Sequence, residues 1–260
     1  MKKLTFFVAT VFIIFSGFSF ASSSEKKMEG DKVKLGNGTV KSWVIVDDNN
    51  VPKSMGITFT VDALTDLPKP TDPGGFPLAV FPDYTTFEYV LKLPDNVMNF
   101  PFKSVGLNWN PTGHPPDCYN NSHFDVHFYM MDENLRTSIT CMGDDTNKVY
   151  KQPDAQYIPQ DYMTAPMTGE ARMGCHWFDP NSAEFHTGFN KTIIYGFYDA
   201  KMVFVEPMIT LDYLNSKPNV TETIKLPKSY QVSGYYPTGY TVKYDEKTKD
   251  KVRYLWPLPR

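Results

Sequence analysis

Short segments of alternating apolar and polar side chains constrain the fold of this chain more than any other feature. In residues 84–93, Phe87, Tyr89 and Leu91 fall on one face, and residues 123–130 alternate in the same way. A period of two is that of a β-strand, and few segments show the helical period. Aromatic residues make up 15% of the chain, which also has 21 prolines. The sequence therefore predicts a mainly β fold, an antiparallel sandwich or open barrel with long proline-rich loops and few short helices.

Turn residues and periodicity place the other elements. Residues 32–41 are expected to form a hairpin, because Gly36-Asn37-Gly38 suits the positive φ angles of a tight turn. The proline-rich stretch 68–82 is expected to be a loop or a connector. Two further hairpins are expected over residues 191–205 and 240–256, and two short helices over residues 132–140 and 209–214.

The first residues have the pattern of a secretory signal peptide. A basic start, Met1-Lys2-Lys3, precedes an apolar stretch of about 17 residues that ends in Ser19-Phe20-Ala21. The alternative is a membrane anchor, but this length is at the lower limit for a span and the small residues favour cleavage. We predict cleavage after Ala21 and a mature chain located in the periplasm or secreted, without stable membrane insertion.

The remaining chain is expected to form one domain. We predict a disordered leader over residues 22–31, a β-rich core over 32–215, and a C-terminal β-hairpin extension of the same domain over 216–260. A chain of this length can bury a substantial core. Its net charge of −3 and pI near 6.0 give no indication of nucleic-acid binding.

Histidines gather in the middle of the sequence and suggest a polar site. All five lie between His114 and His186, and the strand over residues 123–130 contains two of them. Alternation puts His123, Asp125 and His127 on one face of this strand, opposite its apolar residues. Imidazoles and a carboxylate in one row are ligands for a divalent metal. The alternative is that Asp125 simply orients a neighbouring histidine by hydrogen bonding.

Strand geometry limits which of these residues can share an ion. His123 and His127 are about 13 Å apart along a regular strand, whereas neighbours two apart are separated by about 6.6 Å. A zinc–nitrogen bond of about 2.0–2.1 Å therefore requires ligands from other segments. The predicted metal ligands are His123, Asp125, His127 and His176, with Glu206 as a further candidate and His114 and His186 as alternatives. Glu206 either points inward on its strand or caps the strand end before Pro207, in solvent.

Zinc is the metal expected first, and copper is the second. Copper(I) accepts thioether ligands, and five of the 12 methionines lie at Met163, Met167, Met173, Met202 and Met208. Methionine is equally an ordinary filler of irregular cores.

Three cysteines allow one disulfide. In an oxidising compartment we expect Cys141 to pair with Cys175 and to leave Cys118 free. The alternatives are buried unpaired thiols, or a thiol that serves as a soft metal ligand.

The sequence lacks the common catalytic motifs. There is no Gly-x-Ser-x-Gly elbow, no phosphate-binding Gly-x-x-x-x-Gly-Lys loop, no His-Glu-x-x-His and no EF-hand spacing.

Five segments together resemble an uncharacterised family of exported bacterial proteins. They are GHPP at 113–116, HFDVHFY at 123–129, GCHW at 174–177, IYGFYD at 194–199 and FVEPM at 204–208. The family includes a Thermus protein under sigma-E and anti-sigma-E control. The resemblance covers residues 32–215 and implies a β-rich exported domain that assembles into homo-oligomers, with no established activity. Ser122 departs from the family pattern, which has proline before the first histidine.

Three functions remain open at this point. The first is an exported binding or assembly protein of unknown ligand with a His/Asp metal site. The second is a metal-dependent hydrolase or lyase, in which Asp125 or Glu206 would be the general base. The third is a purely structural homo-oligomer in which hydrogen bonds satisfy the histidines.

Overall fold

The computed structural model describes residues 24–246 and 250–257, with side chains as far as residue 246. The predicted signal peptide lies outside these residues. No helix in the described part is both long and apolar enough to cross a membrane.

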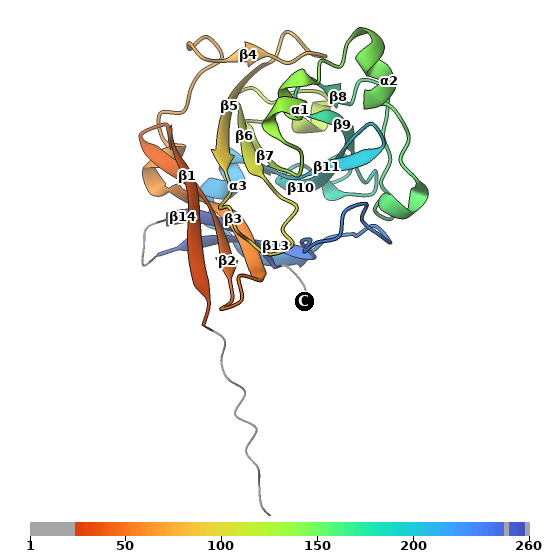
Figure 1. Cartoon of the computed structure of the whole chain (residues 1–260). Coiled ribbons are helices and arrows are strands. Elements are labelled where there is room, and N and C mark those ends of the chain that lie inside the picture. Colours follow the sequence, from red (N-terminus) through yellow and green to blue (C-terminus); the bar gives the residue numbers. More distant parts are fainter. Residues whose placement is uncertain (1–23, 247–249, 258–260) are drawn as a thin grey trace, which may run out of the picture.

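Two antiparallel sheets make up most of the fold (Figure 1). The six-stranded sheet contains, in spatial order, β1 Lys26–Leu35, β2 Gly38–Val46, β3 Pro52–Thr60, β14 Asp250–Pro257, β13 Gly239–Asp245 and β12 Asn219–Thr223. The eight-stranded sheet contains β4 Phe76–Pro77, β5 Thr85–Lys92, β6 Ser104–Asn110, β7 His123–Tyr129, β11 Lys201–Thr210, β10 Lys191–Tyr198, β9 Gly174–Trp177 and β8 Gly169–Glu170. The α-helices of the described residues are short: α1 Glu133–Ser138, α2 Thr146–Val149 and α3 Leu211–Asn215. The predicted mainly β, antiparallel class is confirmed.

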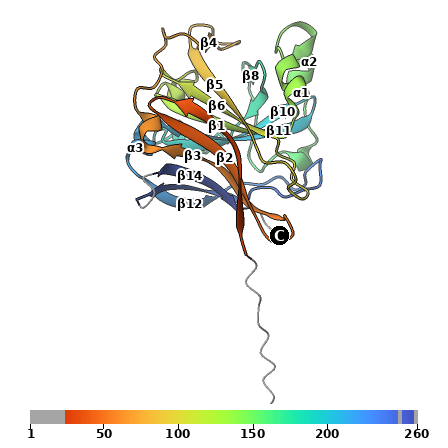
Figure 2. The same ribbon diagram turned by 60° about the vertical axis from the view of Figure 1, so that its left-hand side comes forward.

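The two sheets pack through apolar faces to form the core. Figure 2 shows β3, β14 and β12 beneath β10 and β11. Phe59 of β3 meets Phe124 of β7 edge to face, with ring centroids 5.4 Å apart, and Val126 and Phe128 are fully buried. Burial of this face leaves the opposite face of the curled eight-stranded sheet to carry polar residues.

Loops cover that opposite face. Helices α1 and α2 lie on the side of the eight-stranded sheet away from the six-stranded sheet, next to β8 at the end of the curled eight-stranded sheet (Figures 1 and 2). Every residue of β7 is therefore buried, on both faces. A histidine or carboxylate on this strand is thus enclosed by protein.

Several predicted elements are confirmed. The β1–β2 hairpin turns at Gly36, where φ is 50°. Strands β10 and β11 form the second hairpin, and Asp199 and Ala200 at its turn both have positive φ, as a two-residue turn requires. The predicted C-terminal hairpin consists of β13 and β14. Because β14 pairs with β3, this hairpin lies inside the six-stranded sheet.

Two predictions about disorder and disulfides are wrong. Residues 26–31 of the expected disordered leader belong to β1, because they pair with β2 and Met28 packs on the core. The expected Cys141–Cys175 disulfide is not formed, and all three cysteines are free. The Sγ atom of Cys175 instead lies 2.9 Å from the hydroxyl of Thr164.

Candidate metal centre

The polar face of β7 lies at the centre of the eight-stranded sheet. Its partner β6 places Asn110 opposite His123 and Asn108 opposite Asp125. On the other side, the pairing of β7 with β11 brings Met208 opposite Asp125. The same register places Glu206 across from His127. The predicted common face of His123, Asp125 and His127 is confirmed, and β11 adds a carboxylate to it.

The structure divides the predicted ligands between two clusters. We define the Glu206 cluster as His127, His176 and Glu206, and the Asp125 cluster as His114, His123 and Asp125. Within each cluster, one donor atom from each residue lies within 4.8 Å of the others. The residues of the predicted site therefore meet as two groups of two imidazoles and one carboxylate, and strand spacing separates His123 from His127.

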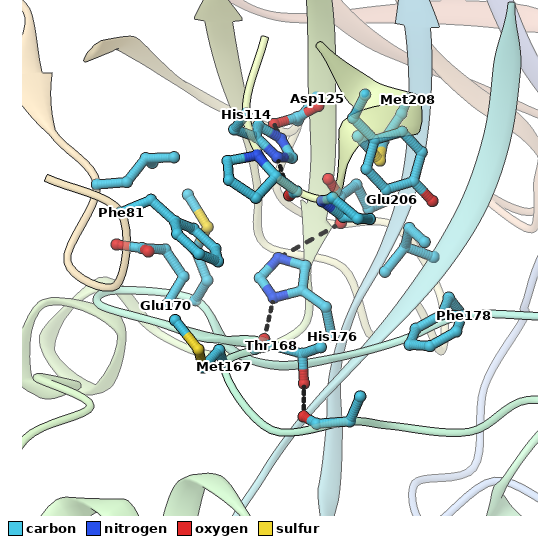
Figure 3. Close-up of a pocket in the computed structure, with 18 of the residues that line it drawn as sticks. Phe81, His114, Asp125, Met167, Thr168, Glu170, His176, Phe178, Glu206 and Met208 are labelled. Carbon is cyan, nitrogen blue, oxygen red and sulfur yellow. Dashed lines mark hydrogen bonds and ion pairs between the residues drawn. The ribbon is translucent and has the colours of Figure 1, made fainter. Parts of the chain in front are cut away.

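The Glu206 cluster joins three strands, because β7, β11 and β9 each contribute one residue. Oε1 of Glu206 lies 3.4 Å from Nε2 of His127, and Oε2 lies 3.6 Å from Nε2 of His176. In Figure 3, His176 is held between Thr168 and Glu206. Its Nδ1 donates to the carbonyl of Thr168 at 2.8 Å, which leaves the Nε2 lone pair facing Glu206. An imidazole fixed in this way is oriented to bind a metal.

Donor atoms of the Glu206 cluster are buried without adequate partners. His127 and Glu206 are 0% and 1% exposed. Among the described residues, neither ring nitrogen of His127 has a hydrogen bond of ordinary geometry, and neither has Oε2 of Glu206. Buried polar atoms of this kind are costly unless something else satisfies them. A cation bound between the three side chains would satisfy them together.

The pKa values of the Glu206 cluster are those of a neutral group. Burial, and then the neighbouring His176, lower the pKa of His127 to about 3. Burial also lowers the pKa of His176 to about 4. Burial, and then the charge of Asp125, raise the pKa of Glu206 well above its usual value. Both imidazoles are thus uncharged near neutral pH, each with one nitrogen lone pair free of a proton, as metal ligation requires.

The Asp125 cluster has the same residue types in a different hydrogen-bonding state. Nε2 of His123 lies 3.1 Å from Oδ1 of Asp125, and Nε2 of His114 lies 3.4 Å from Oδ2. The two Nε2 atoms are 3.1 Å apart, within hydrogen-bonding distance. Asn110 donates from Nδ2 to Oδ2 of Asp125 at 2.7 Å. A single proton shared among these groups pairs most of them without a metal, and among the described residues only Oδ1 of Asp125 lacks a hydrogen bond of ordinary geometry.

The pKa values of the Asp125 cluster agree with this internal pairing. Burial acts to raise the pKa of Asp125, but the charge of His123 and hydrogen bonds from both histidines hold it well below its usual value. Burial acts to lower the pKa of His114, but its hydrogen bond to Asp125, the charge of Asp125 and its contact with the carbonyl of Pro115 together outweigh burial and raise this pKa. The Asp125 cluster is therefore an ion pair, whereas the Glu206 cluster is neutral.

The donor atoms of the Glu206 cluster are close enough to one another to hold one metal ion. Zinc–ligand bonds of about 2.0–2.2 Å place neighbouring tetrahedral donors roughly 3.3 Å apart, close to the separations above. Two imidazoles and one carboxylate are a donor set of catalytic zinc sites, in which a fourth position takes water or substrate. His176 and Glu206 both line a cavity of about 430 Å³, so this fourth position would face the cavity.

No protein-family model, curated protein or solved structure matches this chain. The resemblance to exported bacterial proteins therefore stays a prediction.

The other residues singled out in the sequence lie elsewhere or have other partners. His186 is exposed, and its Nε2 donates to the carbonyl of Pro180 at 3.0 Å. Glu206 does not cap a strand end, because β11 continues through Pro207 to Thr210. Sequence reasoning missed Asn108, which is fully buried and lines the cavity. The signal that could have found it is the alternation along residues 104–110, which puts Ser104, Gly106, Asn108 and Asn110 on one face of the strand.

Proposed function

We propose that this protein binds one divalent metal ion of the zinc class through His127, His176 and Glu206. The bound metal would then hold a small molecule in the adjoining cavity. The main support is the buried donor set of the Glu206 cluster, whose atoms lack adequate hydrogen-bond partners. Neutral imidazoles and a carboxylate provide the ligand types and count that zinc takes.

The surroundings of the ligands favour a stable metal site. The ring of His127 stacks on Tyr129 and meets Phe204 edge to face, with centroids 5.4 and 4.9 Å apart. An apolar shell of this kind excludes water and strengthens electrostatic interactions with a metal. A metal ion would also convert Glu206 to its ionised form, so binding should release a proton.

A metal-dependent hydrolase or lyase is the second candidate function. Asp125 lines the same cavity as His176 and Glu206, and it is in contact with two imidazoles, of His114 and His123, that could pass on a proton. A carboxylate next to a metal-bound water is suited to act as a general base. Turnover of small esters by zinc-loaded protein, lost in Asp125→Asn protein that is still folded and still binds zinc, would favour this candidate over simple binding.

Metal analysis of the full chain, purified without a polyhistidine tag, tests the main proposal. We expect about one zinc per chain and a rise in melting temperature when zinc is added to metal-free protein. Protein that retains no zinc, copper, iron or manganese, and whose melting temperature does not change with any of them, would contradict the proposal.

We further propose that the mature chain acts in the periplasm or in the extracellular medium. The basic start, apolar stretch and small residues of positions 1–21 support this location. Sequencing of the mature N-terminus tests it, with Ser22 expected as the first residue. A first residue of Met1 or Lys2 would contradict cleavage.

Self-association is proposed on the family resemblance alone. Light scattering on the mature chain tests it, and a clean monomer across the micromolar range would contradict it.

A further inference from the structure

The cavity next to the Glu206 cluster has mostly apolar walls. Its volume of about 430 Å³ is within the range of small-molecule sites. The apolar side chains that define it include Leu78, Phe81, Tyr119, Met173, Phe178 and Met208. Such walls favour an apolar body over a strongly hydrated one.

Polar groups are gathered at one part of the cavity. His114, Asp125, His176 and Glu206 all line it, as Figure 3 shows. Asn108 joins them, and its Oδ1 has no hydrogen-bond partner among the described side chains and backbone. A ligand in this cavity would therefore meet polar groups at one end and apolar side chains along its body.

The charge at the polar end would be positive once a metal is bound. A divalent ion carries two positive charges, Glu206 supplies one negative charge, and the two histidine ligands are neutral. Asp125 is paired with His114 and His123, so its negative charge is already offset. One positive charge remains at the metal, and it favours an anionic ligand group.

Glu170 is the other acidic residue of the cavity wall, but its carboxylate is engaged. It accepts hydrogen bonds from the backbone N–H groups of Ala79 and Val80, at 2.7 and 3.4 Å, and from that of Ala171 at 3.2 Å. These bonds tie the loop that contains Phe81 to β8. The wall is therefore fixed in position, and the charge of Glu170 is directed toward the loop.

We propose that the cavity binds a small, mainly apolar monocarboxylic acid whose carboxylate completes the coordination of the metal. This inference rests on the proposed metal site. The ligand would bring one anionic oxygen donor to the metal and would place an uncharged apolar body between Phe81, Phe178 and Met208.

The test compares an acid with its amide on the full-length, zinc-loaded protein. Calorimetric titration with 3-phenylpropanoate and with 3-phenylpropanamide, which have the same body, isolates the contribution of the carboxylate. We expect the acid to bind at least about 10-fold more tightly, because only the acid brings a negative charge to the metal. Removal of zinc should abolish this preference.

Substitutions in the wall test the apolar part. Phe81→Ala should weaken binding of the acid about 5- to 10-fold and leave the zinc content unchanged. Phe100→Ala is the matched control, since Phe100 is also partly buried but lies outside this cavity, and it should change neither quantity.

The outcomes separate the two proposals. If zinc binds in a Glu206-dependent manner but acid and amide bind equally or not at all, the ligand inference fails and the metal proposal stands. Equal binding of the acid with and without zinc also overturns the inference. If zinc itself does not bind, the metal proposal fails, and the ligand inference fails with it.

Discussion

The Glu206 and Asp125 clusters contain the same donor types and differ in how those donors are satisfied. Each has two histidines and one carboxylate: the Glu206 cluster takes them from β7, β9 and β11, and the Asp125 cluster from β7 and from the loop between β6 and β7 that contains His114. In the Asp125 cluster, imidazole and amide groups surround the carboxylate and hold it ionised. In the Glu206 cluster, burial keeps the carboxyl and both imidazoles neutral. Residue types alone thus do not distinguish a metal site from an internal ion pair. The number of buried polar atoms without a hydrogen bond differs: among the described residues it is three in the Glu206 cluster and one, Oδ1 of Asp125, in the Asp125 cluster.

The largest expected effect is on stability, when the carboxylate of the Asp125 cluster is removed. Asp125→Asn removes the negative charge between His114, His123 and Asn110 and replaces one acceptor oxygen by an NH2 donor. We expect the free energy of unfolding of metal-free protein to fall by about 3–5 kcal/mol, the usual cost of breaking a buried ion pair. Urea denaturation measures it. A loss below about 1 kcal/mol would mean that Asp125 is not held in a buried ion pair, and that the two clusters do not differ in this respect.

The next effect is on metal affinity, when the carboxylate of the Glu206 cluster is replaced. Glu206→Gln should weaken zinc binding by about 100-fold or more, because the only anionic ligand is lost. It should not destabilise metal-free protein, in which Glu206 is already neutral. Calorimetric zinc titration measures the affinity.

Glu184→Gln is the matched control for this substitution. Glu184 is another buried carboxylate, outside both clusters, and it accepts hydrogen bonds from Thr192 and Tyr119. Its replacement should leave zinc affinity unchanged. Equal losses of affinity in the Glu184 and Glu206 variants would indicate a general effect on folding.

A smaller effect concerns the pH dependence of stability in metal-free protein. The pKa of Glu206 is raised in the folded state. Its contribution to the free energy of unfolding is therefore fully present below its pKa in the unfolded chain, and is lost as the pH rises through its pKa in the folded protein. Relative to Glu206→Gln, the wild type should lose stability above about pH 4.3, by at most about 1.4 kcal/mol per pH unit.

The wild type and Glu206→Gln are compared at the same pH, so that the effect of His127 and His176 titration on stability largely cancels in the difference. Urea denaturation between pH 4 and pH 7 provides the values. A gap between wild type and variant that stays constant over this range would mean that Glu206 is not held protonated by burial.

The smallest effect is expected at Cys175, next to the ligand His176. Cys175→Ala should lower the free energy of unfolding by about 1 kcal/mol and leave the zinc stoichiometry unchanged. The reason is that its thiol is buried against Thr164 and Thr168 and belongs to neither cluster. Loss of zinc in this variant would indicate a thiolate ligand and a different site.

Much of the fold was predictable, because strand periodicity is a local property. The alternation of residues 123–129 correctly placed His123, Asp125 and His127 on one face. The leader prediction failed at residues 26–31, because their polar composition does not reveal pairing with β2. Whether a polar edge segment is ordered depends on the strand that it meets in space.

The candidate site was predictable in its residues but not in its grouping. Which histidine meets which carboxylate depends on the pairing of β7 with β11 and of β10 with β9, and these pairs are remote in sequence. Pro207 also suggested that the strand ended near Glu206, since proline cannot donate a ladder hydrogen bond. The structure continues β11 past it, and this continuation buries Glu206.

An anomalous difference map from crystals of tag-free protein grown with zinc tests the assignment most directly. We predict one strong peak per chain, about 2.0–2.2 Å from Nε2 of His127, Nε2 of His176 and a carboxylate oxygen of Glu206. The absence of a peak there, or a peak between His114, His123 and Asp125 instead, would contradict the assignment.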